Sequence, residues 1–332
     1  MFAEALEDIL KDVSAPAAVR SIEAGQSPAL LWAAIADAGF LELLASEENG
    51  GAGLALPDLY PVLTMLGAHA VPVPFAQTAA ARVLLTPDQV PTGMLTFAPV
   101  VRRLANGSIS CPLVPFGLIA DHVLAQEEDR LYLLPAKDAV CEPTGVHGSL
   151  TATLSWRGDS GVAAAAAPGV IATFGAAIHS ALIAGGMQRV FGMTLQYAND
   201  RAQFGKSIGK FQAIQHQISV AAEHVAASSI AAESAFQGVG PVPELLAAAI
   251  AKSRTSEAVP LVASIAHAVH GAIGVTEEYD LQLYTRRLHE WRMSHGAESY
   301  WNRVVGRAVI ASDTSLVSDF VRTACASRPA FA

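Results

Sequence analysis

The chain has 332 residues, of which 52% are hydrophobic and 15% are charged, and its formal net charge is -9. This length favours two or three domains with buried cores, and the small number of cations argues against binding to nucleic acid or to an anionic membrane surface. The three cysteines, Cys111, Cys141 and Cys325, are widely spaced and form no C-x-x-C pair, so neither a disulfide framework nor a zinc site is expected.

Residues 1–93 have the pattern of a helical domain. Residues 1–12 carry acidic side chains among apolar ones at helical spacing and lack the basic start and apolar run of an export signal, so we expect a cytoplasmic protein. Apolar residues recur at helical intervals in 31–44 and again in 59–66. Between these stretches, the glycine-rich segment 47–53 interrupts the pattern and is predicted to be a loop.

A small β domain is predicted for residues 94–165. The sequence there changes to short segments rich in β-forming residues, which are separated by Gly, Pro, Asn and Asp. The segments expected to form strands are residues 94–97, 122–125, 130–134 and 149–156.

Residues 166–332 are predicted to form a bundle of long helices. Alanine dominates within the helical segments, and Gly and Pro fall between them or near their ends, which favours antiparallel helices. The helices expected are residues 170–200, 211–237, 242–271 and 294–324.

One segment of this region, 161–188, carries no formal charge and is long enough to cross a bilayer. Its commonest residue is the small alanine rather than leucine or phenylalanine, and it contains Pro168 and the adjacent Gly185 and Gly186; such small residues suit close packing between helices. We therefore expect a buried bundle helix and no insertion into a membrane.

The stretch from Arg201 to Gln212 (RAQFGKSIGKFQ) is the first candidate for a ligand site. Asn199 and Asp200 are expected to end a helix, and the glycines that follow make a turn, so Arg201 projects from a corner between two helices. A guanidinium at such a corner can bind a pyrophosphate, and the Gln212 amide can bind an adenine or ribose edge. The plainer interpretation is a connector in which Arg201 pairs with Asp200 and Phe204 packs in the core.

The stretch from Gly271 to Thr276 (GAIGVT) is the second candidate. It follows a long apolar helix, and its glycines would let backbone N–H groups approach a ligand closely. A simple helix terminator is the alternative. Just before it, His267 and His270 have the i, i+3 spacing of a metal pair, but no Glu-x-x-His set accompanies them, so no metal site is predicted.

Together the two stretches resemble the paired signatures in the C-terminal half of flavin-dependent acyl-CoA dehydrogenases, an R-x-x-F-G...F-Q run and an H-G-G-I-G-x-T run that both touch FAD. The likeness continues from Glu278 to Arg287, and the glycine-rich segment 47–53 is similar to part of the N-terminal domain of this family. The resemblance implies a mainly α fold with a small β domain: an N-terminal helical domain, a short middle β domain and a C-terminal four-helix bundle.

The resemblance also implies FAD as the cofactor. In the family, the first stretch reaches the FAD of a neighbouring subunit, so an oligomer is implied as well. The positions that match the two FAD-contacting signatures are Arg201, Gln203, Phe204, Gly205 and Gln212, and Gly271, Ala272, Gly274 and Thr276.

The sequence departs from the family's pattern in the region of the cofactor. Ala268 stands where the family usually has a Gln, two residues before the H-G pair, which puts one hydrogen bond to the nucleotide half of FAD in doubt. In the middle domain, neither the T-E-P-x-A-G-S-D-like stretch nor the W-I-T/S-N-G-like strand is found. These two segments hold the flavin ring and the acyl thioester in the family.

The catalytic carboxylate of the family is also missing. Dehydrogenation of an acyl-CoA needs a base to remove the α-proton while a hydride leaves the β-carbon for the flavin. In the family this base is a Glu at one of two positions, and the resemblance places His295 at the first and His179 at the second.

Three interpretations of the two histidines follow. A neutral imidazole acts as the base; or the chain completes the FAD pocket of a related catalytic partner, as in heteromeric acyl-CoA dehydrogenases of steroid side-chain breakdown; or the scaffold serves a flavin-dependent monooxygenase. The plain alternative is that each histidine is a core residue whose ring makes its hydrogen bonds inside the protein.

We favour the partner-subunit interpretation, because the base and the middle-domain motifs are missing while the corner that serves a neighbour's cofactor is intact. The expected function is FAD-dependent α,β-dehydrogenation of a fatty, branched or steroid acyl-CoA. The chain would act in a homo- or hetero-oligomer of two or four subunits, with an electron acceptor such as an electron-transfer flavoprotein. The opposing hypothesis is a structural or regulatory protein that keeps the bundle for assembly and binds no flavin.

Overall fold

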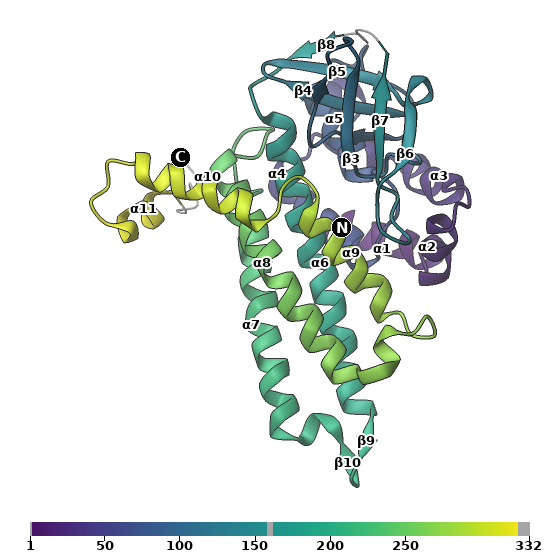
Figure 1. The fold of residues 1–332 in the computed structure, drawn as a ribbon, viewed down its shortest axis with the longest axis vertical. Coiled ribbons are helices and arrows are strands. Elements are labelled where there is room, and N and C mark those ends of the chain that lie inside the picture. The colour runs from purple at the N-terminus through teal and green to yellow at the C-terminus, as the bar shows by residue number, and fades with distance from the viewer. Residues whose placement is uncertain (1, 158–161, 325–332) are drawn as a thin grey trace.

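The computed structural model describes residues 2–157 and 162–324 of the chain, so Cys325 lies outside the described residues. In chain order it contains a group of short helices, a β region and a set of long helices (Figure 1). The predicted fold class, mainly α with a small β part between two helical parts, is confirmed.

The N-terminal part consists of α1–α5 and two short 3-10 helices. Their bounds are Phe2–Val13 (α1), Pro16–Glu23 (α2), Ala29–Asp37 (α3), Phe40–Glu42 (η1), Glu47–Asn49 (η2), Leu56–Ala68 (α4) and Phe75–Leu84 (α5). Helix α4 packs directly against the long helix α6 (Val170–Asp200). Glycines permit this close crossing: a Cβ added to Gly67 would lie 2.1 Å from the Leu182 carbonyl oxygen, and one added to Gly185 would lie 1.9 Å from that of Thr64.

The β region is built from two four-stranded sheets that face each other. One sheet has the order β1 (Leu95–Phe97), β4 (His122–Glu127), β5 (Arg130–Pro135), β8 (Val162–Ala165), and the other has the order β2 (Arg102–Arg103), β3 (Ile109–Val114), β7 (Ala152–Trp156), β6 (Val140–Pro143). Val123 and Leu134 from the first sheet share one apolar cluster with Ile109, Leu154 and Trp156 from the second. The sheets therefore enclose their own small core.

All four predicted strand segments contain strands, although the last begins later than expected, at Ala152. Four strands of this region were missed: β2, β3, β6 and β8. β3 contains Pro112, which interrupts a strand pattern. The exposed β6 and the two-residue β2 lack the buried alternation that marks a strand in a sequence.

The C-terminal part is the helical bundle, with α6 at its centre (Figure 1). Helix α6 packs against α4, α7, α8 and α9. The bounds of the other elements are Ala202–Gln203 (β9), Lys206–Ser207 (β10), Ile208–Lys210 (η4), Gln212–Ser234 (α7), Leu245–His270 (α8), Gly271–Val275 (η5), Leu281–Met293 (α9), Glu298–Ala311 (α10) and Val317–Ala324 (α11).

The predicted helix 170–200 is confirmed at both ends, and those at 211–237 and 242–271 are confirmed with slightly shorter bounds. The single helix predicted for 294–324 is wrong, because this segment forms two helices, α10 and α11, which residues 312–316 separate. His295 and Gly296 have φ angles of +53° and +93°, which no right-handed helix contains, so the chain turns there before α10 begins.

Helix α9 was missed as a helix. It buries Leu281, Tyr284, Leu288 and Trp291, which recur at helical spacing among many charged residues. Its sequence therefore carried the signal of an amphipathic helix.

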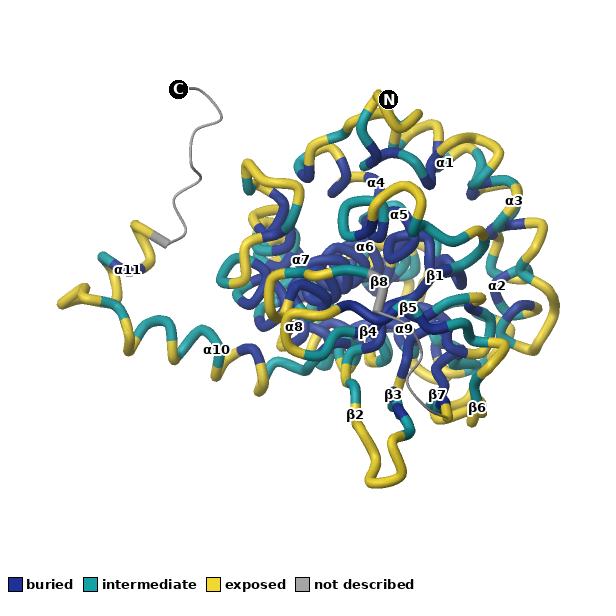
Figure 2. Tube along the Cα trace, turned by 90° about the horizontal axis from the view of Figure 1, so that it is seen from above, coloured by how far each residue is buried: buried dark blue, intermediate teal, exposed yellow. Residues whose placement is uncertain are grey.

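By length and composition, α6 and the segment Leu245–Val275 could each span a membrane. The relevant window of α6 is 94% buried inside the protein, as expected for the core helix of a bundle, whereas that of Leu245–Val275 is half buried. Figure 2 shows α6 in the buried centre of the molecule, while α10 and α11 extend away from the body with much of their surface exposed.

Candidate functional site

The corner that follows α6 is a hairpin that projects from the far end of the bundle (Figure 1). Gln203 of β9 pairs with Lys206 of β10, and the two residues between them, Phe204 and Gly205, have φ angles of +53° and +78°. A two-residue hairpin turn with both φ angles positive is of type I′, which suits glycine and is uncommon for phenylalanine. The Phe204 side chain is 92% exposed.

The geometry of this corner disagrees with a plain connector. The Asp200 carboxylate accepts a hydrogen bond from Gln196 Nε2 at 2.7 Å instead of pairing with Arg201. Within the described residues, the Arg201 side chain has no ion pair or hydrogen bond, and it is exposed. Phe204 points to solvent and does not pack in the core. The corner therefore presents a free cation and an exposed ring.

A cavity of about 500 Å³ joins the two sequence stretches. Five of the candidate residues line it: Arg201, Gln203 and Phe204 from the corner, and Gly271 and Ala272 from the end of α8. Its other lining residues are Tyr197, Ile208, Phe211, Ile214, Ala268, Val269 and His270. Two segments that are far apart in the sequence thus form one site.

Four candidate residues do not line this cavity. Gly205 forms the tip of the hairpin, and Gln212 is exposed at the start of α7. Gly274 is buried, and a Cβ added there would lie 3.0 Å from His270 Cβ and 3.1 Å from Leu281 Cδ2. The Thr276 hydroxyl donates to the Ile273 carbonyl at 2.9 Å, so it closes the turn after α8.

The lining residues fit part of a dinucleotide such as FAD. The unpaired guanidinium of Arg201 can bind a diphosphate, and the aromatic rings of Tyr197 and Phe204 offer surfaces for a planar group. At Gly271, whose φ is +65°, a Cβ would meet nothing within 4 Å, so the backbone there is open to a ligand. Ala268 also lines the cavity, and its methyl group cannot supply the hydrogen bond of the Gln that the family has there.

Sequence reasoning missed the aromatic stack on one wall of the cavity. The Tyr197 ring lies 4.4 Å from the His270 ring in a stacked arrangement, and Tyr279 approaches the same imidazole at 5.1 Å. Tyr197 precedes Arg201 by four residues, one helical turn, and this spacing was the available signal. The Nδ1 of His270 donates to the Ala266 carbonyl at 2.7 Å, and burial lowers its pKa, so the imidazole is neutral.

His267, the other histidine of the i, i+3 pair, does not take part in the aromatic stack around His270. His267 Nε2 and the Thr285 hydroxyl lie 2.9 Å apart, within hydrogen-bonding distance. Among residues 2–157 and 162–324, no group of three or more potential metal ligands occurs.

The two histidines at the expected base positions come together inside the bundle. His179 lies on α6 and His295 lies in the turn between α9 and α10, and their ring centroids are 5.1 Å apart. Both residues are buried. A Cβ added to Gly175 would lie 2.1 Å from His295 Nδ1, so the ring of His295 fills the notch that this glycine leaves on α6.

These imidazoles have few hydrogen bonds. His179 Nδ1 donates to the Gly175 carbonyl at 2.7 Å, and its Nε2 has no partner among the described residues. Neither ring nitrogen of His295 has a partner there. Burial lowers the pKa of His295 to about 3, with the charge of Lys252 as a further cause. The pKa of His179 is held well below its usual value, first by burial and then by the electrostatic effects of His295 and Lys252. Both rings are neutral at pH 7.

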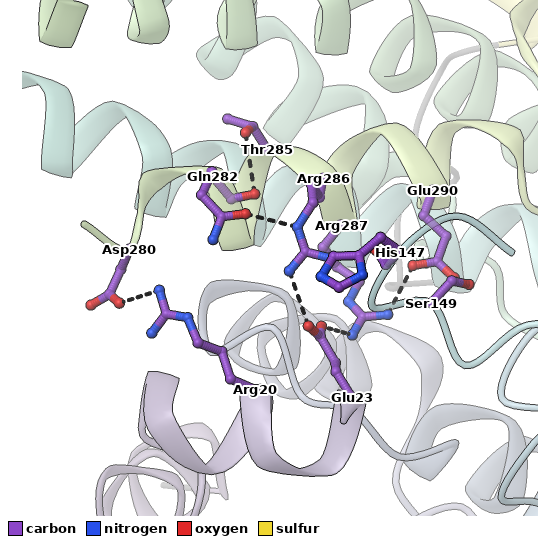
Figure 3. A network of polar contacts seen from close by, with 10 residues as sticks. All are labelled: Arg20, Glu23, His147, Ser149, Asp280, Gln282, Thr285, Arg286, Arg287 and Glu290. Carbon is purple, nitrogen blue, oxygen red and sulfur yellow. Dashed lines mark hydrogen bonds and ion pairs between the residues drawn. The ribbon is translucent and has the colours of Figure 1, made fainter. Parts of the chain in front are cut away.

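A buried polar network connects α9 to the rest of the protein (Figure 3). Arg286 and Arg287 of α9 both bind the Glu23 carboxylate of α2, the former at 3.0 Å. Arg287 also pairs with Glu290 at 2.8 Å, and Glu290 accepts a hydrogen bond from Ser149 in the segment before β7. Three distant parts of the chain thus meet at α9, just before the turn that carries His295.

Comparison with known proteins agrees with this architecture. The family model "Acyl-CoA dehydrogenase, C-terminal domain" matches residues 171–310, and the model of the N-terminal domain matches residues 1–87. The chain is 30% identical to acyl-CoA dehydrogenase IpdE2 of Mycolicibacterium smegmatis over 303 residues, which cover 86% of this chain and 90% of that protein. The chain belongs to the acyl-CoA dehydrogenase family.

Two solved structures share the acyl-CoA dehydrogenase fold of this chain. The ChsE4-ChsE5 complex from Mycobacterium tuberculosis has a TM-score of 0.82 at 22% identity and covers 94% of this chain and 97% of the other. A steroid ACAD, the Tcur3481-Tcur3483 G363A variant, has a TM-score of 0.80 at 24% identity and covers 92% and 95%. Membership of the family also supports FAD as the cofactor, as the sequence predicted.

Proposed function

We propose that this chain is an acyl-CoA dehydrogenase-like flavoprotein subunit that completes an FAD site at a subunit interface and lacks the usual catalytic Glu. The reaction it serves is the α,β-dehydrogenation of an acyl-CoA thioester in the cytoplasm. One observation carries the proposal: the exposed corner of Arg201 and Phe204 forms a cavity with Gly271, whereas His179 and His295 are buried in the bundle.

The cavity residues have the chemistry to hold the nucleotide part of FAD. Arg201 would bind the diphosphate, Gln203 has an amide for a ribose or adenine edge, and the backbone at Gly271 permits close approach. FAD, when bound, accepts the hydride that leaves the β-carbon of the thioester. The exposure of Phe204 and Arg201 at the end of the bundle supports their contact with a cofactor that a second subunit also holds.

The proton step needs a base that can reach the substrate. A general base works best when its pKa lies near the working pH and it lies within hydrogen-bond reach of the proton. Burial holds the pKa of His295 at about 3 and that of His179 well below the ordinary value, so both are weak bases. This supports a related chain as the source of the base, and a heteromeric complex is the form in which ChsE4-ChsE5, of the same fold, was solved.

The binding proposal is tested with the chain purified alone and after co-expression with related chains from its genomic neighbourhood. We expect a yellow complex with the absorption spectrum of a flavin, and native mass determination should give two or four subunits. Arg201→Ala should weaken FAD binding at least tenfold, about 1.4 kcal/mol, because a charge-assisted contact is lost. The matched control is Arg303→Ala, an exposed arginine on α10. Colourless protein in both preparations would reject the proposal.

The source of the base is tested by bleaching of the flavin with an acyl-CoA under anaerobic conditions. We expect the complex that carries His179→Ala and His295→Ala in this chain to bleach within about threefold of the wild-type rate. A loss of about 100-fold or more, with FAD still bound, is the size of a general-base contribution. That result would assign the base to this chain.

A further inference from the structure

Lys252 lies at the centre of the bundle, and its side chain is fully buried on α8. Its ammonium group donates to Ser256 Oγ at 2.9 Å, to the Trp291 carbonyl at 2.9 Å and to the Arg292 carbonyl at 2.8 Å. Within the described residues, no carboxylate lies within ion-pair distance of it. Two of the three acceptors belong to the last turn of α9, where a helix carries partial negative charge. Lys252 therefore caps α9.

The turn that follows this capped end carries His295. Its backbone is left-handed at His295 and Gly296, an uncommon conformation for a residue with a side chain. On the far side of the turn, Trp301 Nε1 donates to the His295 carbonyl at 2.9 Å. The ring itself fills the notch at Gly175. Contacts with three helices thus fix the turn: Lys252 of α8 binds the end of α9 before it, Trp301 of α10 binds its backbone, and Gly175 of α6 receives its ring.

We propose that Lys252 is a positioning residue for His295: by binding the last carbonyls of α9, it fixes the left-handed turn that sets the His295 ring against His179. It acts through α9 and touches neither ring directly. This inference concerns the isolated chain, so it stands or falls independently of the flavin site and of any partner subunit.

The charge of Lys252 also opposes a proton on either of the two rings. It is a secondary cause, after burial, of the lowered pKa of His295, and it contributes to that of His179 after burial and His295. The other charged groups near Lys252 are Glu298 and Arg292, which bind each other, with Arg292 Nε donating to Glu298 at 3.0 Å. Burial lowers the pKa of Lys252 to about 7, and Glu298 opposes this effect.

Nuclear magnetic resonance of the full chain with 15N-labelled histidine rings tests the proposal. We expect a nuclear Overhauser effect between the rings of His179 and His295, and no protonation of either ring above about pH 5. A wild-type chain whose two rings show no Overhauser effect, or whose rings protonate between about pH 5.5 and about pH 8.5, would overturn the proposal.

A variant separates positioning from general stability. Lys252→Met removes the ammonium and keeps the length of the side chain, and Lys11→Met makes the same change on the exposed surface of α1. In the first variant we expect loss of the ring-to-ring Overhauser effect and ring protonation at a pH about one unit higher. The second should match the wild type. A folded Lys252→Met protein with the wild-type Overhauser effect would also overturn the proposal. If this variant does not fold, the Overhauser effect and the ring titration of the wild-type chain test the proposal by themselves.

Discussion

The rings of His179 and His295 lie 5.1 Å apart, so the two positions at which the family resemblance expects a catalytic base meet at one point between α6 and the turn after α9. In the sequence they are 116 residues apart, and only the family resemblance connected them. The structure adds that the site they share is filled, because the ring of His295 occupies the notch at Gly175. A filled site with weakly basic rings is consistent with a chain that relies on another subunit for the proton step.

The buried histidines predict a stability that falls on the acid side of neutrality. The pKa of His295 is lowered to about 3, whereas an unfolded chain has a His pKa of about 6.5. Between these values the unfolded state binds more protons than the folded state, so the free energy of unfolding falls as pH falls below about 6.5. Each ring that stays neutral contributes a slope of up to about 1.4 kcal/mol per pH unit.

Urea unfolding at about pH 7 and about pH 5 measures this dependence. His295→Asn, which cannot be protonated, should lose less stability over that interval than the wild type. His147→Asn alters an exposed histidine and should behave as the wild type does. An equal pH dependence in His295→Asn and the wild type would show that this ring does not stay neutral in the folded state.

The ion pair between Arg287 and Glu23 predicts a large loss of stability when one partner is removed. Their side chains are 3% and 6% exposed, and the pair joins α9 to α2 (Figure 3). Glu23→Gln removes the charge that Arg286 and Arg287 share and leaves Arg287 with Glu290 as its remaining counter-ion, so we expect the free energy of unfolding to fall by about 3 kcal/mol. The comparison is Glu7→Gln, which breaks a surface pair with Lys11 and should change stability by less than about 1 kcal/mol. Similar effects for both variants in urea unfolding would contradict the importance of this network.

Most of the long helices could be predicted from the sequence, whereas the side-chain contacts between them could not. Helix α6 could be predicted because its first 19 residues, 170–188, are mostly apolar or small and carry no formal charge, as suits the core of a bundle. Lys252 was missed because a lysine in a helix normally faces solvent, and only the tertiary structure brings the end of α9 to its ammonium group. The corner at Arg201 was found from its motif, whereas the opposite wall with Tyr197 depends on the stack with His270.

Two glycines of α6 predict opposite responses to the same substitution. A Cβ at Gly185 would lie 1.9 Å from the Thr64 carbonyl oxygen of α4, so Gly185→Ala must force these helices apart and should destabilise the protein by about 3 kcal/mol. A Cβ at Gly192 would meet nothing within 4 Å, so Gly192→Ala should gain up to about 1 kcal/mol from helix propensity. Thermal unfolding of both variants checks this, and a neutral Gly185→Ala would mean that α4 and α6 are not packed this closely.

Phe204 predicts a change in association without a change in the stability of the subunit. Its ring is 92% exposed and has an edge contact with Phe211, with the ring centroids 6.3 Å apart, and its φ of +53° is unfavourable for a residue other than glycine, so the isolated chain gains little from this side chain. Phe204→Gly should therefore leave the melting temperature of the separate chain unchanged or slightly higher.

If the corner contacts a neighbouring subunit, the same variant should weaken assembly at least tenfold, because a buried aromatic ring at an interface contributes well over 1 kcal/mol. The matched control is Val239→Gly, which removes another highly exposed apolar side chain, from the loop between α7 and α8. Analytical ultracentrifugation of the three proteins with the partner chain measures the effect, and equal association of Phe204→Gly and the wild type would place the corner outside the interface.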